Sequence, residues 1–202
     1  MALRVAPRSR SKRHKVTLAE YERMAEAGVF EPDARIELIR GEIIDMTPPG
    51  PDHETSVTRL TLLFVEQCHR RAVVWPQGNG ISIPQSESRP QPDITILKWR
   101  DDLYKWKRAG VEDVLLIVEV ADSTLKFDRG TKLRLYAEAG IPEYWVVNLV
   151  DGVVEVYTGP AVGTYQTVRI AHRGEMLPLP GGFGGTIAAG EMLDADLPGD
   201  AE

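Results

Sequence analysis

Apolar residues at helical spacing predict three helices in the chain. The longest covers residues 53–71. Its buried face is formed by Val57, Leu60, Phe64 and Cys68. Shorter helices are predicted at residues 18–28 and 129–140, and a glycine ends each of them. These helices are separated along the chain by runs of a different pattern.

Short alternating or continuously apolar runs predict strands between the helices. Residues 35–46 and 143–158 each hold two runs around a tight turn, so each predicts a β-hairpin. Further strands are predicted at residues 72–75, 80–83, 93–99, 113–120 and 165–171. Helices and strands follow one another without an internal linker or repeat. This order predicts an α/β domain with a mixed central β-sheet flanked by helices.

Composition is ordinary for a globular protein of 202 residues, which is enough for one domain with a sizeable core. No apolar run approaches the roughly 20 residues of a membrane span, and the N-terminus lacks the apolar core of a secretory signal. The single cysteine, Cys68, excludes an internal disulfide and a cysteine-built zinc site. We therefore expect a cytoplasmic protein without a membrane segment.

Charge is distributed unevenly along the chain. The formal net charge is −6. The charged side chains of the first fifteen residues are nevertheless all basic, and they are Arg4, Arg8, Arg10, Lys12, Arg13 and Lys15. We predict a disordered basic tail at residues 1–15, a domain at residues 16–193 and an acidic tail at residues 194–202. The basic tail is either a solvated arm or an arm that touches phosphate backbones, and the sequence leaves both interpretations open.

An acidic residue, Glu119, interrupts the apolar run "VLLIVEV" and needs a partner. A buried carboxylate without one costs several kcal/mol, so a cation, a metal ion or strong donors should lie beside it. Asp93 opens another predicted strand. If the two carboxylates converge, Mg²⁺ or Mn²⁺ would relieve their repulsion. Lys132, on the helix that follows Glu119, is then placed to orient or deprotonate a water molecule.

Three segments occur in an order that resembles a known family: "QPDITIL", then "LIVEVADST", then "DRGTKLRLYAEAGIPEYWVVN". This pattern resembles the restriction-endonuclease-like family of the PD-(D/E)XK nuclease superfamily, a bacterial family long known as a domain of unknown function. The resemblance extends over about residues 16–193. It implies a four-stranded mixed sheet flanked by helices, a homodimer, and Mg²⁺-dependent cleavage of phosphodiester bonds in DNA.

The same resemblance assigns roles to individual residues. It implies that Asp93 and Glu119 hold the metal ion and that Lys132 completes the catalytic set. The superfamily usually places its lysine two residues after the glutamate, where this chain has Ala121. In the resembling family the lysine is thought to come from the following helix, which is the position of Lys132.

Four further polar residues near these motifs have two interpretations each. His53 either faces the site behind the metal ligands or caps a helix at the surface. Glu37 either reaches the metal region from a neighbouring strand or is an exposed hairpin residue. Asp128 and Arg129 are expected to be helix N-terminal residues rather than catalysts, because an acid there favours the helix dipole.

A basic and aromatic segment lies between the two motif acids. Its cations are Lys98, Arg100, Lys105, Lys107 and Arg108, and they alternate with Trp99, Tyr104 and Trp106. Cations and aromatic rings together suit nucleic acid, because phosphates meet the cations and bases stack on the rings. The alternative is an irregular insertion whose rings pack on the core or on a dimer partner.

Three hypotheses therefore follow from the sequence. The first is a metal-dependent DNA endonuclease that uses Asp93, Glu119 and Lys132. The second is a catalytically silent protein of the same fold that binds nucleic acid or a protein partner, in keeping with Ala121. The third is a structural dimer module in which Glu119 and Lys132 form only a buried ion pair. Metal binding and cleavage distinguish the three.

Overall fold

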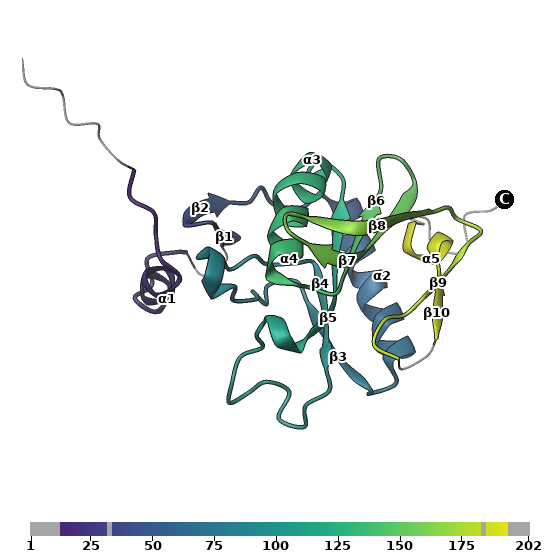
Figure 1. Ribbon diagram of the computed structural model, residues 1–202, viewed down its shortest axis with the longest axis horizontal. Helices are drawn as coiled ribbons and strands as arrows, with labels where there is room; N and C mark the ends of the chain where they lie inside the picture. Colours follow the sequence, from purple (N-terminus) through teal and green to yellow (C-terminus); the bar gives the residue numbers. More distant parts are fainter. Residues whose placement is uncertain (1–12, 32–33, 183–184, 194–202) are drawn as a thin grey trace, which may run out of the picture.

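The computed structural model describes residues 13–31, 34–182 and 185–193. The predicted tails at residues 1–15 and 194–202 lie outside these ranges, apart from residues 13–15. Among the described residues no helix is both long and apolar enough to cross a membrane. Figure 1 shows a central sheet with helices packed on it and a smaller N-terminal lobe beside it.

The central sheet has six strands in the order of the chain, β3-β4-β5-β6-β7-β8. They are β3 (Ala72–Pro76), β4 (Ile94–Lys98), β5 (Val114–Ala121), β6 (Glu143–Asn148), β7 (Val153–Ala161) and β8 (Thr164–Ala171). Only β5 and β6 run parallel, and every other neighbouring pair is antiparallel. The sheet is therefore mixed as predicted, but it has six strands where the family resemblance implied four.

Helices cover the two faces of this sheet. On one face, α2 (Pro51–Cys68) and α5 (Ala189–Leu193) pack over an apolar layer that contains Leu60, Phe64 and Trp145. The crossover from β5 to β6 covers the other face and consists of α3 (Leu125–Phe127), a π-helical turn η3 (Asp128–Lys132) and α4 (Leu133–Ala139). A parallel pair of strands requires such a crossover.

The N-terminal lobe consists of α1 (Leu18–Glu26) and a hairpin of β1 (Ile36–Ile39) and β2 (Glu42–Asp45). The hairpin turns at Arg40 and Gly41, which both have positive φ, as a two-residue turn requires. Backbone hydrogen bonds between Leu38 and Arg89 attach the lobe to the chain that leads into β4. This attachment places β1 beside the end of the main sheet.

Both predicted hairpins are confirmed. The helix predicted at residues 53–71 is also confirmed, and it covers Pro51–Cys68. The strand predicted at residues 80–83 is wrong, because Ser82 and Ile83 form only isolated bridges and the 3₁₀ turn η1 (Pro84–Ser86) follows at once. A second 3₁₀ turn, η2 (Val111–Asp113), precedes β5. The short strands β9 (Met176–Pro178) and β10 (Thr186–Ala188) were not predicted, because their three-residue runs show no clear apolar alternation.

Candidate active site

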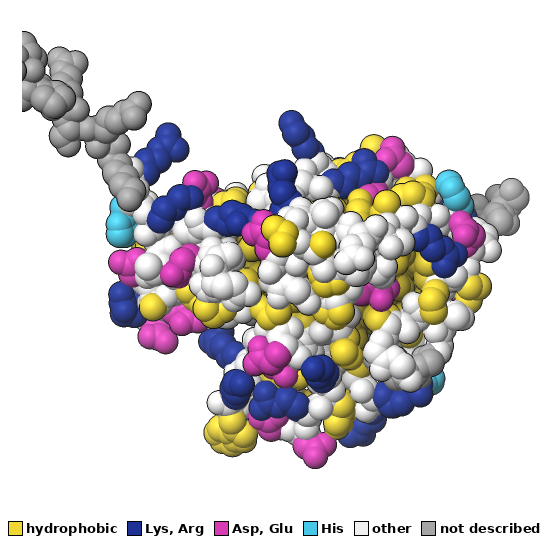
Figure 2. All heavy atoms as spheres, viewed as in Figure 1, with side chains coloured by type: hydrophobic (Ala, Val, Ile, Leu, Met, Phe, Trp, Pro, Cys, Tyr) yellow, Lys and Arg dark blue, Asp and Glu magenta, His cyan; other side chains and the backbone are white. Residues whose placement is uncertain are grey.

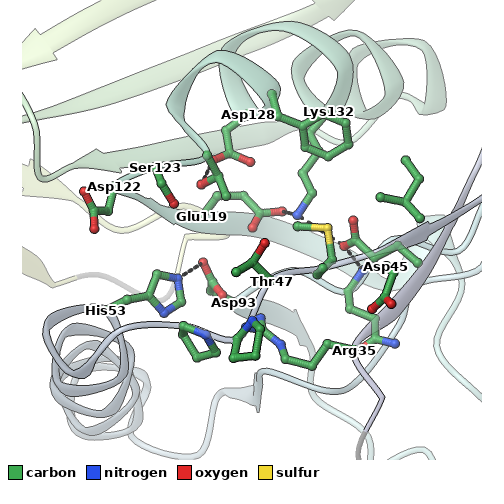
Figure 3. A pocket seen from close by; sticks show the side chains of 18 of the residues that line it. Arg35, Asp45, Thr47, His53, Asp93, Glu119, Asp122, Ser123, Asp128 and Lys132 are labelled. Carbon is green, nitrogen blue, oxygen red and sulfur yellow. Dashed lines mark hydrogen bonds and ion pairs between the residues drawn. The ribbon is translucent and has the colours of Figure 1, made fainter. Parts of the chain in front are cut away.

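Asp93 and Glu119 come together at one end of the sheet. Ile94 pairs with Val118 across β4 and β5, so Asp93 stands opposite Glu119 where the strands diverge. The carboxylate of Asp93 accepts a hydrogen bond of 2.8 Å from the Val120 amide. Both acids are buried, with 5% and 3% of their surface exposed. Figure 3 shows the two side chains entering the same pocket.

Lys132 meets these acids from the opposite side. Its Nζ lies 2.9 Å from Oε1 of Glu119 and 3.2 Å from Oε1 of Glu37, and 3% of the residue is exposed. One turn later Tyr136 donates a hydrogen bond of 2.8 Å to the same oxygen of Glu119. The π-helical turn that ends at Lys132 sets this direction, and such turns often occur at functional sites.

Glu37 is a buried member of the site, not an exposed hairpin residue. It lies on β1 with 1% of its surface exposed, and its Oε1 accepts the Gln91 amide at 2.6 Å. Within the described residues its Oε2 has no hydrogen-bond partner. Glu37 thus brings the N-terminal lobe into contact with Lys132 and leaves one carboxylate oxygen free.

His53 belongs to the pocket wall, near the start of α2. Its Nε2 lies 3.2 Å from Oδ2 of Asp93, and Nδ1 is buried without a partner among the described residues. Burial opposes the charged ring, but the carboxylate of Asp93 outweighs it and raises the pKa of His53. Gln77 donates a further hydrogen bond to Oδ1 of Asp93. These contacts hold the Asp93 side chain in one orientation.

Asp128 lies in the pocket, although its sequence position predicted only a residue at the start of a helix. It lies at the beginning of η3 with 2% of its surface exposed, and Thr124 donates a hydrogen bond of 2.6 Å to its Oδ2. Burial raises the pKa of Asp128 to about 6. Its spacing of four residues from Lys132 would have placed both on one helical face, and that was the available signal.

The pocket that these residues surround has a volume of about 410 Å³. Its acidic lining residues are Glu37, Asp45, Asp93, Glu119, Asp122 and Asp128. Among the lining residues that the structure describes, only Arg35 and Lys132 are permanent cations. Burial and the neighbouring carboxylates raise the pKa of Glu119, although Lys132 opposes this. Burial disfavours the ammonium of Lys132, but the surrounding carboxylates outweigh it and raise its pKa.

Comparison with known proteins agrees with this architecture. A family model described as "Uma2: Putative restriction endonuclease" matches residues 18–191. The chain belongs to the Uma2 family. This assignment confirms the family resemblance that the three sequence segments indicated. No curated protein matches the chain significantly.

A solved structure shares the fold of this Uma2 protein. It is described as a "putative nuclease belonging to DUF820 from Anabaena variabilis ATCC 29413". The two chains superpose with a TM-score of 0.67 at 16% sequence identity, over 88% of this chain and 97% of the other. The comparison confirms the α/β fold with a mixed central sheet.

The carboxylates of the pocket suit a divalent ion that keeps several water ligands, rather than an ion that is coordinated by protein side chains alone. In the part of the chain that the structure describes, no three His, Cys, Asp or Glu side chains are grouped to hold a metal ion. Mg²⁺ takes one or two carboxylates and keeps several waters, so Asp93 and Glu119 suffice. The hydrogen bonds that described residues donate to Glu119 end at Oε1, which leaves Oε2 for a cation.

The basic and aromatic segment lies at the far end of β4 from this pocket. It begins at Lys98, the last residue of β4, whereas Asp93 precedes Ile94, the first residue of β4. The five residues of β4 span about 17 Å. Figure 2 shows Lys and Arg side chains with acids between them at the lower edge of the molecule, where Figure 1 places this loop. Trp106 is 78% exposed there. The nucleic-acid contacts of this segment stay a prediction.

Proposed function

We propose that this Uma2 protein is a metal-dependent endonuclease that hydrolyses phosphodiester bonds in DNA. The observation that carries the proposal is the meeting of Asp93, Glu119 and Lys132 in one acidic pocket. The described part of the chain lines that pocket with six carboxylates and two permanent cations, so an anionic phosphodiester needs further positive charge in order to enter. Divalent cations supply such charge, and restriction-endonuclease-like families generally use them.

In this proposal Asp93 and Glu119 hold Mg²⁺ or Mn²⁺. A divalent ion held there would supply Lewis-acid chemistry for the phosphoryl oxygens and would lower the pKa of a water molecule. Asp93 is already oriented for this task by the Val120 amide and by His53. His53 and Glu37 do not hold the ion themselves in this proposal. His53 orients Asp93, and Glu37 holds Lys132.

Lys132 acts as a fixed positive charge rather than as a base. The surrounding carboxylates favour its protonated form, so it does not accept a proton near neutral pH. A buried ammonium can donate a hydrogen bond to the attacking water and stabilise charge that develops on the phosphate. We assign Lys132 to positioning the water and to this charge stabilisation.

The substrate class and the assembly are part of the same proposal. The family resemblance supports DNA as the substrate and a homodimer as the assembly. The cytoplasm is the proposed location, and this rests on the sequence, which has no apolar secretory core and a single cysteine. The basic segment, with Lys98, Arg100, Lys105, Lys107 and Arg108, is proposed to contact DNA outside the cleavage site.

Metal titration with a cleavage assay tests the proposal. Mn²⁺ and Mg²⁺ should raise the thermal unfolding temperature of the wild type but not that of the Asp93→Asn, Glu119→Gln double variant. Supercoiled plasmid should be nicked by the wild type and not by Glu119→Gln. Glu143→Gln, which removes a carboxylate outside the pocket, is the matched control and should behave as wild type. Persistent nicking by a pure Glu119→Gln preparation contradicts the assignment.

One observation favours the silent-fold alternative. Ala121 occupies the usual lysine position, and the ammonium of Lys132 is already shared by Glu119 and Glu37. A protein of this kind would bind metal ion and DNA without cleaving. Metal-dependent stabilisation and DNA binding in the absence of nicking, across several DNA substrates, would favour this alternative.

A further inference from the structure

We propose that Arg35 is the residue that binds a backbone phosphate of the substrate beside the scissile bond. The inference rests on the proposed nuclease function and adds a substrate-binding residue to it. Neither the sequence motifs nor the family match assigns a role to Arg35.

The first step of the argument is position. Arg35 directly precedes β1 and lines the same pocket as Asp93 and Glu119. Its carbonyl accepts a hydrogen bond of 2.8 Å from the Met46 amide, which continues the pairing of the hairpin. The guanidinium is therefore carried on an anchored backbone. Figure 3 shows Arg35 on the hairpin side of the pocket, across from Asp122 and Ser123.

The second step is the state of the guanidinium. Within the described ranges, the Arg35 side chain makes no hydrogen bond or ion pair. Other arginines of the chain are engaged: Arg40 with Glu138, Arg89 with Glu22, Arg100 with Asp102 and Arg129 with Glu155. Arg35 remains unengaged although it lines a pocket rich in carboxylates. Its donors are thus available to a ligand.

The third step is chemical complementarity. A guanidinium presents a planar fork of N–H donors that matches two oxygens of a phosphate. Lys132, the other permanent cation of the lining, is already held by Glu119 and Glu37. Among the described lining residues, Arg35 is therefore the permanent cation left to meet the substrate. The hydroxyl groups of Thr47 and Ser123 line the same pocket and add neutral donors for phosphate oxygens.

A salt titration of DNA binding tests this role. Binding of a labelled 12-base-pair duplex in Mn²⁺ is measured by fluorescence anisotropy. The protein carries Lys132→Gln, which removes the proposed catalytic lysine and keeps both metal-binding carboxylates. Adding Arg35→Gln should weaken binding by about tenfold and reduce the slope of log K against log [salt] by about one. Arg35→Lys keeps the charge but loses the fork, so it should retain the slope and lose part of the affinity.

Arg169→Gln is the matched control, because it removes the same charge from β8, outside the pocket. It should leave affinity and slope unchanged. If the Lys132→Gln chain does not fold, cleavage is measured instead in the background that keeps Lys132, with Mn²⁺ present. Arg35→Gln should then raise KM by a larger factor than it lowers kcat.

The outcomes separate the two proposals. Cleavage by the wild type, with unchanged binding and slope in Arg35→Gln, overturns the role of Arg35 and leaves the nuclease function intact. A wild type that neither binds nor cleaves DNA in Mn²⁺ overturns both. A loss of affinity with an unchanged slope also counts against Arg35, because a purely structural defect removes no phosphate contact.

Discussion

The Nζ atom of Lys132 lies 2.9 Å from Oε1 of Glu119, and both residues are almost completely buried. The contact joins the crossover helix to the central strand of the sheet. The same ammonium reaches Glu37 on the N-terminal hairpin at 3.2 Å. One cation thus links three separate parts of the fold and reduces the cost of burying two carboxylates.

Removal of this cation should destabilise the protein strongly. Lys132→Met leaves Glu119 and Glu37 buried without their partner, so we expect a loss of about 3–5 kcal/mol in the free energy of unfolding. Urea unfolding at pH 7 measures it. The loss should be smaller when Lys132→Met is made in a Glu119→Gln background. Equal losses in the two backgrounds would show that the ion pair is not the cause.

Tyr136 should contribute to both stability and activity through Glu119. Tyr136→Phe removes a buried hydrogen bond of 2.8 Å and should cost about 1–2 kcal/mol. It should also slow cleavage, because the carboxylate loses a donor that orients it. Tyr165→Phe is the control, since that hydroxyl donates to the Ile141 carbonyl away from the pocket. Tyr165→Phe should lower the free energy of unfolding by a similar amount but leave cleavage unchanged. An equal loss of cleavage in both variants would mean that Tyr136 has no specific role in the site.

Glu155 should make stability depend on pH. Burial alone would raise its pKa, but hydrogen bonds from Arg129, Tyr157 and Asn148 outweigh burial and lower the pKa of Glu155. Its contribution is therefore present above the unfolded-state pKa of about 4.3 and is lost as pH falls through the folded value.

Comparison with Glu155→Gln isolates this contribution. At pH 7 the wild type should be more stable by about 1–3 kcal/mol, and by pH 3.5 the difference should have narrowed. Urea unfolding of both chains at the two pH values measures the change. A difference that does not vary with pH would mean that the carboxylate charge plays no part.

The basic segment should affect long substrates more than short ones. Its distance of about 17 Å along β4 corresponds to about five base pairs of duplex. Replacing Lys105, Lys107 and Arg108 by Gln should raise KM for a 30-base-pair duplex and leave kcat unchanged. A duplex of 8 base pairs should show little change in either constant. Equal effects on both lengths would argue for a general structural defect.

Much of the site was predictable because strand alternation is simple. The alternation that places Glu119 with Ile117 and Ala121 on one face of β5 holds, and these two residues belong to the same apolar cluster. The sequence indicated that the strands of Asp93 and Glu119 are neighbours, and the register that pairs Ile94 with Val118 then sets the two acids opposite each other. The position of each acid along its strand therefore predicted most of the arrangement of Asp93 and Glu119.

The unpredicted parts depend on contacts between distant segments. Nothing local in the sequence shows that the hairpin carrying Glu37 folds against Lys132, since this depends on the pairing of Leu38 with Arg89. The π-helical turn at residues 128–132 was likewise hidden, because a helical pattern does not distinguish it from an α-helix. Asp128 was therefore assigned to a helix end.

The position of Glu37 on a separate lobe has a consequence during protein synthesis. The chain emerges from the N-terminus, so Glu37, Asp93 and Glu119 are all made before Lys132. Until that lysine appears, closing this end of the sheet would bury carboxylates without a counter-ion. The cleft should thus remain open and hydrated in every shorter nascent chain. If the chain cuts nucleic acid as proposed, it would then acquire this site only after most of its domain had been made.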